Sequence, residues 1–151
     1  LARVALADCL DDLAVDGRIC VVPLHSGAKT RAAAGQDLVV AVLRQAMKGL
    51  PAPRGQVQIA DVLQIRPNRL QQKVLNRQQR AGNVTGNIRA SPRTRVQGLN
   101  AVIFDDVMTS GATLQAAARA VSARGGLVRA GVVVAYRPWI CADLQGRRVS
   151  G

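Results

Sequence analysis

Apolar and polar positions along this chain predict helices that alternate with short apolar strands. Residues 1–15 carry apolar side chains at roughly helical spacing with aspartates between them, which predicts a helix that ends at Gly17. The apolar run at residues 18–23 predicts a buried strand, and Asp37 is placed to cap the helix that follows. We expect the buried stripe of that helix to comprise Leu38, Val42, Leu43 and Met47.

The second half of the chain repeats this alternation. Apolar runs at residues 61–65, 100–105 and 127–136 predict three further strands, and residues 114–124 predict a helix closed by Gly125 and Gly126. Strands that alternate with helices favour an α/β fold in which helices flank an open parallel sheet. The length of 151 residues suits one domain over residues 1–151. The expected buried side of the helix is Leu114, Ala117, Ala118 and Val121.

Composition narrows this picture. Hydrophobic residues make up 48% of the chain but aromatic residues only 2%, so the core must be aliphatic, as in a parallel sheet covered by helices. Cys9, Cys20 and Cys141 lack metal-ligand spacing and suggest reduced thiols in a cytoplasmic protein. We expect no membrane span. Without an initiator Met, we expect the natural N-terminus to lie upstream, and residues 141–151 to be a frayed tail.

The chain carries many more positive than negative side chains. Twenty-one Lys and Arg residues against nine acids give a net charge of +12, which favours phosphate-bearing partners or nucleic acid, unless much of the charge is simply solvated. Residues 62–104 contain no acid, and we expect much of this stretch to form a long basic loop. It could be a hood over an active site, a nucleic-acid surface or a solvated loop. Its candidate contacts are Lys73, Arg77 and Arg80.

The strongest candidate chemistry lies at residues 102–113. An apolar run reaches Asp105 and Asp106, and a turn of small hydroxyl residues around Gly111 leads into the predicted helix. Backbone N–H groups at a helix N-terminus bind phosphate, and the aspartates can accept hydrogen bonds from adjacent sugar hydroxyls. The alternative is a polar turn without a ligand. The phosphate loop would comprise Thr109, Ser110, Gly111, Ala112 and Thr113.

A second candidate loop follows the strand at residues 18–23. Ligands of open parallel sheets bind at the carboxyl ends of strands, so we expect this loop on the same edge as Asp105. Lys29 and Arg31 supply charge for a diphosphate, and His25 either touches the ligand or is a polar loop residue. Trp139, after the last strand, is a candidate for stacking or for packing. The candidate loop comprises Leu24, His25, Ser26, Gly27, Lys29 and Arg31.

Residues 102–113 closely resemble the phosphoribosyl pyrophosphate (PRPP) signature of type I phosphoribosyltransferases. The resemblance implies that Asp105 and Asp106, as the catalytic pair, meet the ribose hydroxyls while residues 109–113 cradle the 5′-phosphate. It also implies that the loop after residue 23 takes the pyrophosphate. Mg²⁺ would bind with PRPP and be held mainly by ligand oxygens and water, without dedicated metal ligands in the protein.

Further segments resemble the ComF family of phosphoribosyltransferase-like proteins, which are linked to bacterial DNA uptake. They are residues 21–25, 35–37 and 75–86. This resemblance implies transfer of a phosphoribosyl group to or from a nitrogenous base. Alternatively, it implies a non-catalytic protein that senses PRPP or a nucleotide and binds DNA or competence proteins. The chain departs from the family at Ala34, where Arg is usual. The family's N-terminal cysteine-rich zinc module is not in this sequence, as we expect if the natural N-terminus lies upstream.

Overall fold

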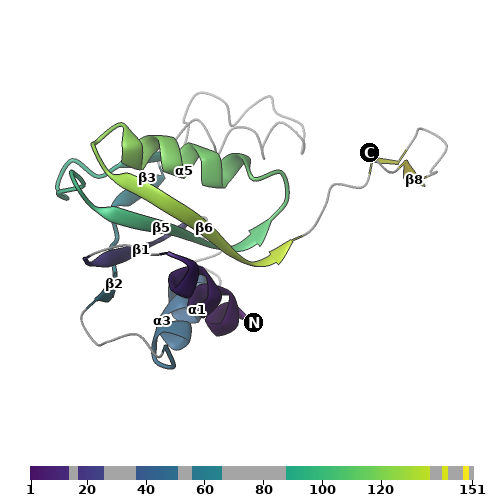
Figure 1. The fold of residues 1–151 in the computed structure, drawn as a ribbon. Coiled ribbons are helices and arrows are strands. Elements are labelled where there is room, and N and C mark those ends of the chain that lie inside the picture. Colours follow the sequence, from purple (N-terminus) through teal and green to yellow (C-terminus); the bar gives the residue numbers. More distant parts are fainter. Residues whose placement is uncertain are drawn as a thin grey trace, which may run out of the picture.

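A four-stranded, wholly parallel sheet organises the molecule (Figure 1). The computed structural model describes residues 1–13, 17–25, 37–50, 56–65 and 88–136, and the strand residues 141–142 and 148–149. The strand order is β2-β1-β5-β6. The strands are β1 (Ile19–Pro23), β2 (Val57–Ile59), β5 (Asn100–Met108) and β6 (Leu127–Tyr136). With helices on both faces, the predicted α/β class with an open parallel sheet is confirmed.

Helices cover the two faces of the sheet unequally. The helices α1 (Ala2–Asp12) and α3 (Leu38–Met47) lie on one face, and α5 (Ala112–Ser122) lies on the other (Figure 1). The antiparallel hairpin of β3 (Leu63–Ile65) and β4 (Ile88–Ala90) packs on the α5 side. The short strands β7 (Cys141–Ala142) and β8 (Arg148–Val149) pair with each other. No helix in these described segments is long and apolar enough to cross a membrane.

The core is aliphatic apart from Phe104 and lies on both faces of the two inner strands. Val21, Val102 and Phe104 join the cluster beneath α1 and α3, whereas Val22 and Ile103 join the cluster beneath α5. This alternation follows from the two-residue period of a strand. All five side chains are at most 1% exposed. Because both faces of these two strands are buried, each strand is a continuous run of apolar residues in the sequence.

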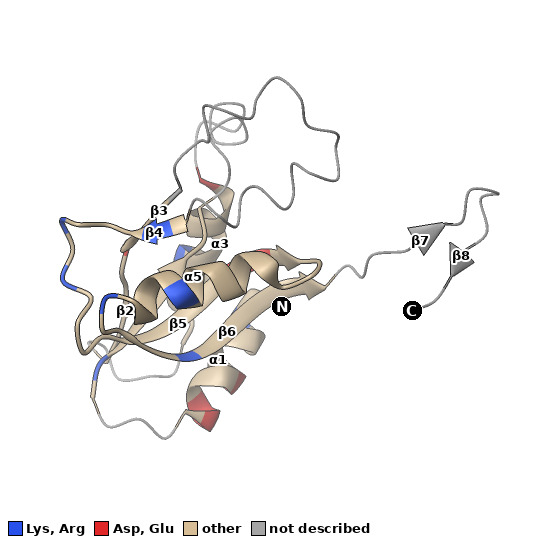
Figure 2. Cartoon of the chain, turned by 90° about the horizontal axis from the view of Figure 1, so that it is seen from above, with Lys and Arg blue, Asp and Glu red and all other residues tan. Residues whose placement is uncertain are grey.

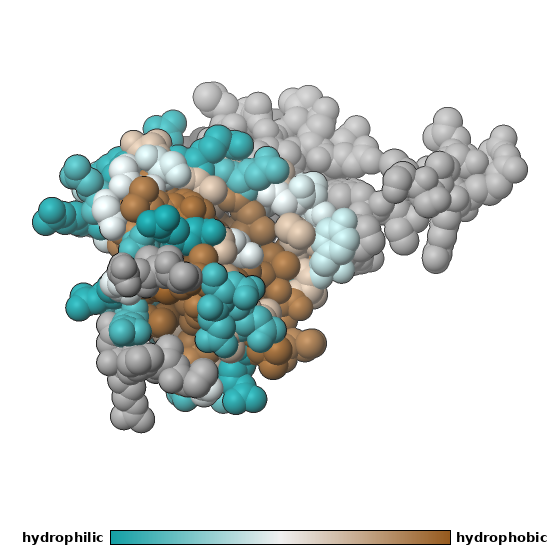
Figure 3. Space-filling model, viewed as in Figure 1, coloured by the Kyte–Doolittle hydropathy of each residue, from teal (hydrophilic) through white to brown (hydrophobic). Residues whose placement is uncertain are grey.

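The strand β6 forms one edge of the sheet and is much more exposed than β5. Leu127 and Tyr136 are 48% and 62% exposed, and Figure 3 shows an apolar area over this part of the molecule. The span of β6 matches the predicted residues 127–136. The β-branched residues at the centre of β6 therefore predicted the strand correctly, although β6 is only partly buried.

The second strand of the sheet differs from the prediction. The predicted strand at residues 61–65 is confirmed over residues 63–65, which form β3, but this strand pairs with β4 in a separate hairpin and does not join the parallel sheet. The sheet instead takes Val57–Ile59 as β2, where Ile19 pairs with Val57 and Val21 with Ile59. Three residues are too few for a readable alternation, so only pairing with β1 distinguishes this strand from its surroundings.

The helices also differ from the prediction, in which side chains they bury and in where the first of them ends. Val39, Leu43 and Ala46 are the buried positions of α3, whereas Leu38 and Val42 are 41% and 37% exposed. The first residues of this helix are all apolar, so the sequence does not determine which of them face the core. The predicted buried face is therefore displaced around the helix axis from the observed one. The helix α1 ends at Asp12, and Gly17, with its φ of 111°, lies in the segment that leads to β1. On α5, Ala116 is buried, while Leu114 and Ala118 are only partly covered.

Candidate functional site

The acidic pair lies inside β5 and not after it. The predicted strand ends at residue 105, but β5 continues to Met108, where it still pairs with Tyr136 of β6. Both aspartates are half-buried. The backbone N–H of Asp106 donates to Asp105 Oδ1 at 2.9 Å, and that of Val107 donates to Asp106 Oδ1 at 2.8 Å. The pair therefore lies on the last part of β5, where β6 is the only strand that pairs with it among the described residues.

The carboxyl of Asp105 is unusually hard to ionise. Burial raises its pKa from 3.8 to about 7, and the adjacent Asp106 adds to the increase, while a hydrogen bond from the backbone of Asp106 opposes it. A hydroxyl donor or a cation beside this carboxyl would stabilise the ionised form. The position is thus suited to a ligand that brings such groups.

The loop after β5 presents backbone donors at the start of α5. Gly111 is the N-cap with a φ of 73°, a left-handed conformation that glycine adopts without strain, and no side chain caps the helix. Ser110 Oγ accepts from the Ala112 N–H at a long 3.4 Å. Thr109 and Ser110 are exposed, and Thr113 is partly exposed. Exposed N–H groups and hydroxyls at the positive end of a helix dipole can bind an anion.

The end of β1 lies beside this edge. Pro23 pairs with Phe104, and the Leu24 N–H donates to the Phe104 carbonyl at 2.8 Å. Leu24 and His25 therefore leave the sheet next to Asp105. The other predicted residues of this loop (Ser26, Gly27, Lys29 and Arg31) lie outside the described residues. So do Lys73, Arg77, Arg80 and Trp139.

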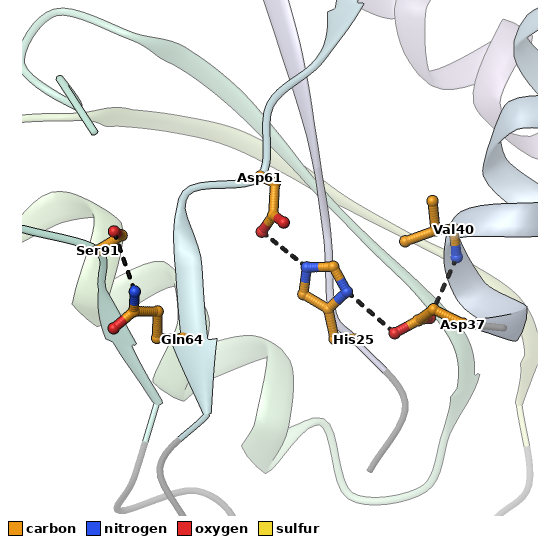
Figure 4. Close-up of polar contacts among 6 residues, drawn as sticks. All are labelled: His25, Asp37, Val40, Asp61, Gln64 and Ser91. Atoms are coloured by element: carbon orange, nitrogen blue, oxygen red, sulfur yellow. Dashed lines mark hydrogen bonds and ion pairs between the residues drawn. The ribbon is translucent and has the colours of Figure 1, made fainter. Parts of the chain in front are cut away.

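A histidine held between two aspartates is the part of this edge that sequence reasoning missed (Figure 4). His25 Nδ1 lies 3.0 Å from Asp37 Oδ2, and His25 Nε2 lies 2.7 Å from Asp61 Oδ1. Asp37 also caps α3 as predicted, because its Oδ1 accepts from the Val40 N–H at 3.3 Å. The three residues join the ends of β1 and β2 to the start of α3. Topology alone could have signalled this, since parallel strands end at one edge.

The histidine cluster borders a cavity of about 310 Å³, with Arg44 and the apolar side chains of Val40 and Ile59 among its lining. Both imidazole nitrogens face carboxylates, so His25 connects the end of β1 to Asp37 at the start of α3 and to Asp61 after β2. Within the described segments, no group of three or more His, Cys, Asp or Glu side chains is arranged to hold a metal ion.

We predict that Asp37→Ala destabilises the fold more than Asp61→Ala. The Asp37 side chain is 12% exposed and supports both His25 and the helix cap, so its loss should cost about 1–2 kcal/mol. The Asp61 side chain is 65% exposed, and its ion pair should contribute less than about 1 kcal/mol. Urea unfolding of both variants measures the difference. Equal losses would contradict the cap assignment.

Comparison with known proteins finds similarity to solved phosphoribosyltransferase structures at low sequence identity. No family model matches the chain, and no curated protein matches it. A hypoxanthine phosphoribosyltransferase from Staphylococcus aureus superposes with a TM-score of 0.49 at 10% identity, covering 99% of this chain and 67% of that one. One from Trypanosoma cruzi, in a ternary substrates complex, gives a TM-score of 0.47 at 16% identity, covering 92% and 74%.

Proposed function

We propose that this protein binds Mg–PRPP at the carboxyl edge of β5 and transfers its phosphoribosyl group to or from a nitrogenous base. The observation that carries the proposal is the continuous arrangement of Asp105 and Asp106, the left-handed Gly111 and the uncapped start of α5. In this proposal the 5′-phosphate sits on residues 109–113. The ribose hydroxyls donate to the aspartates, and the pyrophosphate lies on the loop that starts at Leu24.

The donor set fits such a ligand. A hydroxyl donor or a cation would stabilise the ionised form of the half-buried Asp105 carboxyl. An anion would be attracted to the start of α5 by the helix dipole. A sugar phosphate carries its hydroxyls and its phosphate in that relation. Mg²⁺ bound with PRPP would neutralise charge on the pyrophosphate, held mainly by the ligand's own oxygens and water.

The chemistry requires positioning and no nucleophile from the protein. The bond from C1 of the ribose to the pyrophosphate oxygen breaks and the oxygen keeps the electron pair. The acceptor nitrogen then bonds to C1 and loses its proton to the departing pyrophosphate or to water. The aspartates fix the ribose and lie near the positive charge that develops on it. Most of the rate acceleration would come from holding the two reactants in the reactive orientation and from stabilising the positive charge on the ribose.

A narrower proposal is that the protein is ComF-like and cytoplasmic. Its support is the sequence resemblance, of which residues 75–86 lie outside the described residues. The second candidate function is a non-catalytic protein that senses PRPP or a nucleotide and binds DNA or competence proteins. The exposed Arg89 of β4, with Arg119 and Arg124 in the second half of α5 and just after it, supports this second candidate because arginines bind phosphate groups.

The test is a calorimetric titration with Mg–PRPP, ribose 5-phosphate and pyrophosphate, followed by a screen for pyrophosphate release with purines, pyrimidines and amines. Thr113→Val should weaken PRPP and ribose 5-phosphate by about tenfold, because it removes a hydroxyl donor to a charged group. Ser122→Ala, at the opposite end of α5, is the matched control and should change neither affinity. Absence of PRPP binding would refute the proposal. Binding without pyrophosphate release would favour the sensor.

A further inference from the structure

His25 has a carboxylate beside each of its two ring nitrogens (Figure 4). Its Nδ1 lies 3.0 Å from Asp37 Oδ2, and its Nε2 lies 2.7 Å from Asp61 Oδ1. A neutral imidazole has one N–H donor and one nitrogen that only accepts, and a carboxylate only accepts. Both contacts are therefore hydrogen bonds at the same time only when both ring nitrogens carry a proton. The arrangement fits the positively charged imidazolium.

The two carboxylates differ in how firmly they are held. The Asp37 side chain is 12% exposed, and its other oxygen accepts from the Val40 N–H at the start of α3. The Asp61 side chain is 65% exposed, so water can replace its contact with the ring. When His25 carries a single proton, we expect that proton on the Asp37 side, because a buried acceptor without a donor costs more than an exposed one. The contact with Asp61 is the one that requires the second proton.

The contact between His25 and Asp61 joins two segments beyond the end of their strand pairing. The strands β1 and β2 pair as far as Val21 and Ile59, and the Ala60 N–H donates to the Val21 carbonyl at 2.9 Å. His25 and Asp61 each lie shortly after the last residue of their strand. The imidazolium thus fixes the chain where it leaves β1, which is where the candidate pyrophosphate loop begins.

Other charged groups of the described segments also surround this position. Arg44 of α3 lines the cavity that the cluster borders, and Asp105 and Asp106 lie on β5, the neighbour of β1 in the sheet. Burial raises the pKa of Asp105 to about 7, so this carboxyl titrates in the range where an imidazole does. An experiment on His25 must therefore separate its titration from that of Asp105.

We propose that the His25 imidazolium, by bridging Asp37 and Asp61, positions the start of the loop that binds pyrophosphate, and that pyrophosphate affinity falls when His25 loses its charge. The inference rests on the proposed function, which assigns the pyrophosphate to the loop that starts at Leu24. His25 is a positioning residue here. It ties the loop to the start of α3 and to the end of β2, and it need not touch the ligand.

The two protons of His25 can be observed directly, because it is the only histidine of the chain. In untagged protein with isotopically labelled histidine, proton–nitrogen NMR spectra show whether each ring nitrogen carries a proton. Both nitrogens should be protonated at about pH 5.5, and Nε2 should be the one that loses its proton as the pH is raised. A ring with one protonated nitrogen at the lower pH, or one that loses the Nδ1 proton first, would overturn the proposal.

The variant Asp61→Asn tests the positioning role. An asparagine side chain accepts through its oxygen and donates through its nitrogen, so it can contact His25 in either protonation state. Between about pH 5.5 and about pH 8.5, calorimetry should show pyrophosphate affinity falling about threefold more in the wild type than in the variant, the scale of an exposed charged contact. Titration of the ligand and of Asp105 affects both proteins and cancels in the ratio of their affinities. Ribose 5-phosphate, which has no pyrophosphate, should give the same ratio at both pH values.

The matched control is Asp8→Asn, which removes the same charge from an exposed position on α1. Its pyrophosphate affinity relative to the wild type should not change with pH. A pH-independent ratio for Asp61→Asn would overturn the positioning role and leave the proposed function standing, and so would a change that ribose 5-phosphate shares. Absence of pyrophosphate binding by the wild type at both pH values would overturn the proposed function and the positioning role together.

Discussion

Replacing Asp105 with asparagine is expected to stabilise the fold at neutral and alkaline pH while weakening Mg–PRPP binding by tenfold or more. A carboxyl that burial makes hard to ionise costs free energy in its charged form. The same charged form is the acceptor that the ribose hydroxyls would need. A hydrogen bond to a charged group contributes about 1.5–3 kcal/mol, which sets the scale of the lost affinity.

The pH dependence of stability has a defined sign. The pKa of Asp105 is raised from 3.8 to about 7, so the native state holds its proton more tightly than the unfolded state. Stability is therefore lost as the pH rises between those values and levels off above about 7. A shift of this size would correspond to about 4 kcal/mol, but solvent reaches the half-buried carboxyl, and we expect about 1–2 kcal/mol.

Urea unfolding of Asp105→Asn at about pH 5 and pH 8 measures this effect, and calorimetry measures the affinity. The gain in stability should be larger at the higher pH. Asp12→Asn, which removes an exposed carboxylate on α1, is the control and should show no comparable gain. A variant that is less stable than the wild type at pH 8 would contradict the assigned cost of the charge.

Replacing Phe104 with alanine is expected to cost about 3–5 kcal/mol of stability. Phe104 is fully buried beneath α1 and α3 and directly precedes the acidic pair. Its loss would leave a cavity against Leu6, Val39 and Leu43, all at most 2% exposed. Because domains of this size are stable by about 5–15 kcal/mol, the variant should be near unfolding at room temperature.

Chemical denaturation provides the measurement, and Phe104→Leu provides the control. Leucine keeps most of the buried volume, so its cost should be about 1–1.5 kcal/mol. If alanine and leucine cost the same small amount, Phe104 does not fill the core between the sheet and the two helices. Since Phe104 adjoins Asp105 on β5, the alanine variant should also lose PRPP affinity through displacement of the strand.

The amino-acid sequence by itself determined the features that depend on neighbouring residues. The alternation of helices and strands, the capping role of Asp37 and the succession of Asp105, Asp106 and the loop to α5 are all local in the chain. Local steric and capping preferences act over a few residues, so they leave readable signals. The candidate phosphate loop is predictable for that reason.

Tertiary structure decided whatever depends on residues distant in the chain. The three residues of β2 are a strand only because β1 pairs with them, and the phase of α3 follows from what the sheet covers. His25 meets Asp61 across 36 positions, and Ile88 of β4 joins the same buried cluster as the inner face of α5. Such contacts depend on strand order and register, which fix how elements meet in space. Local sequence patterns do not encode that geometry.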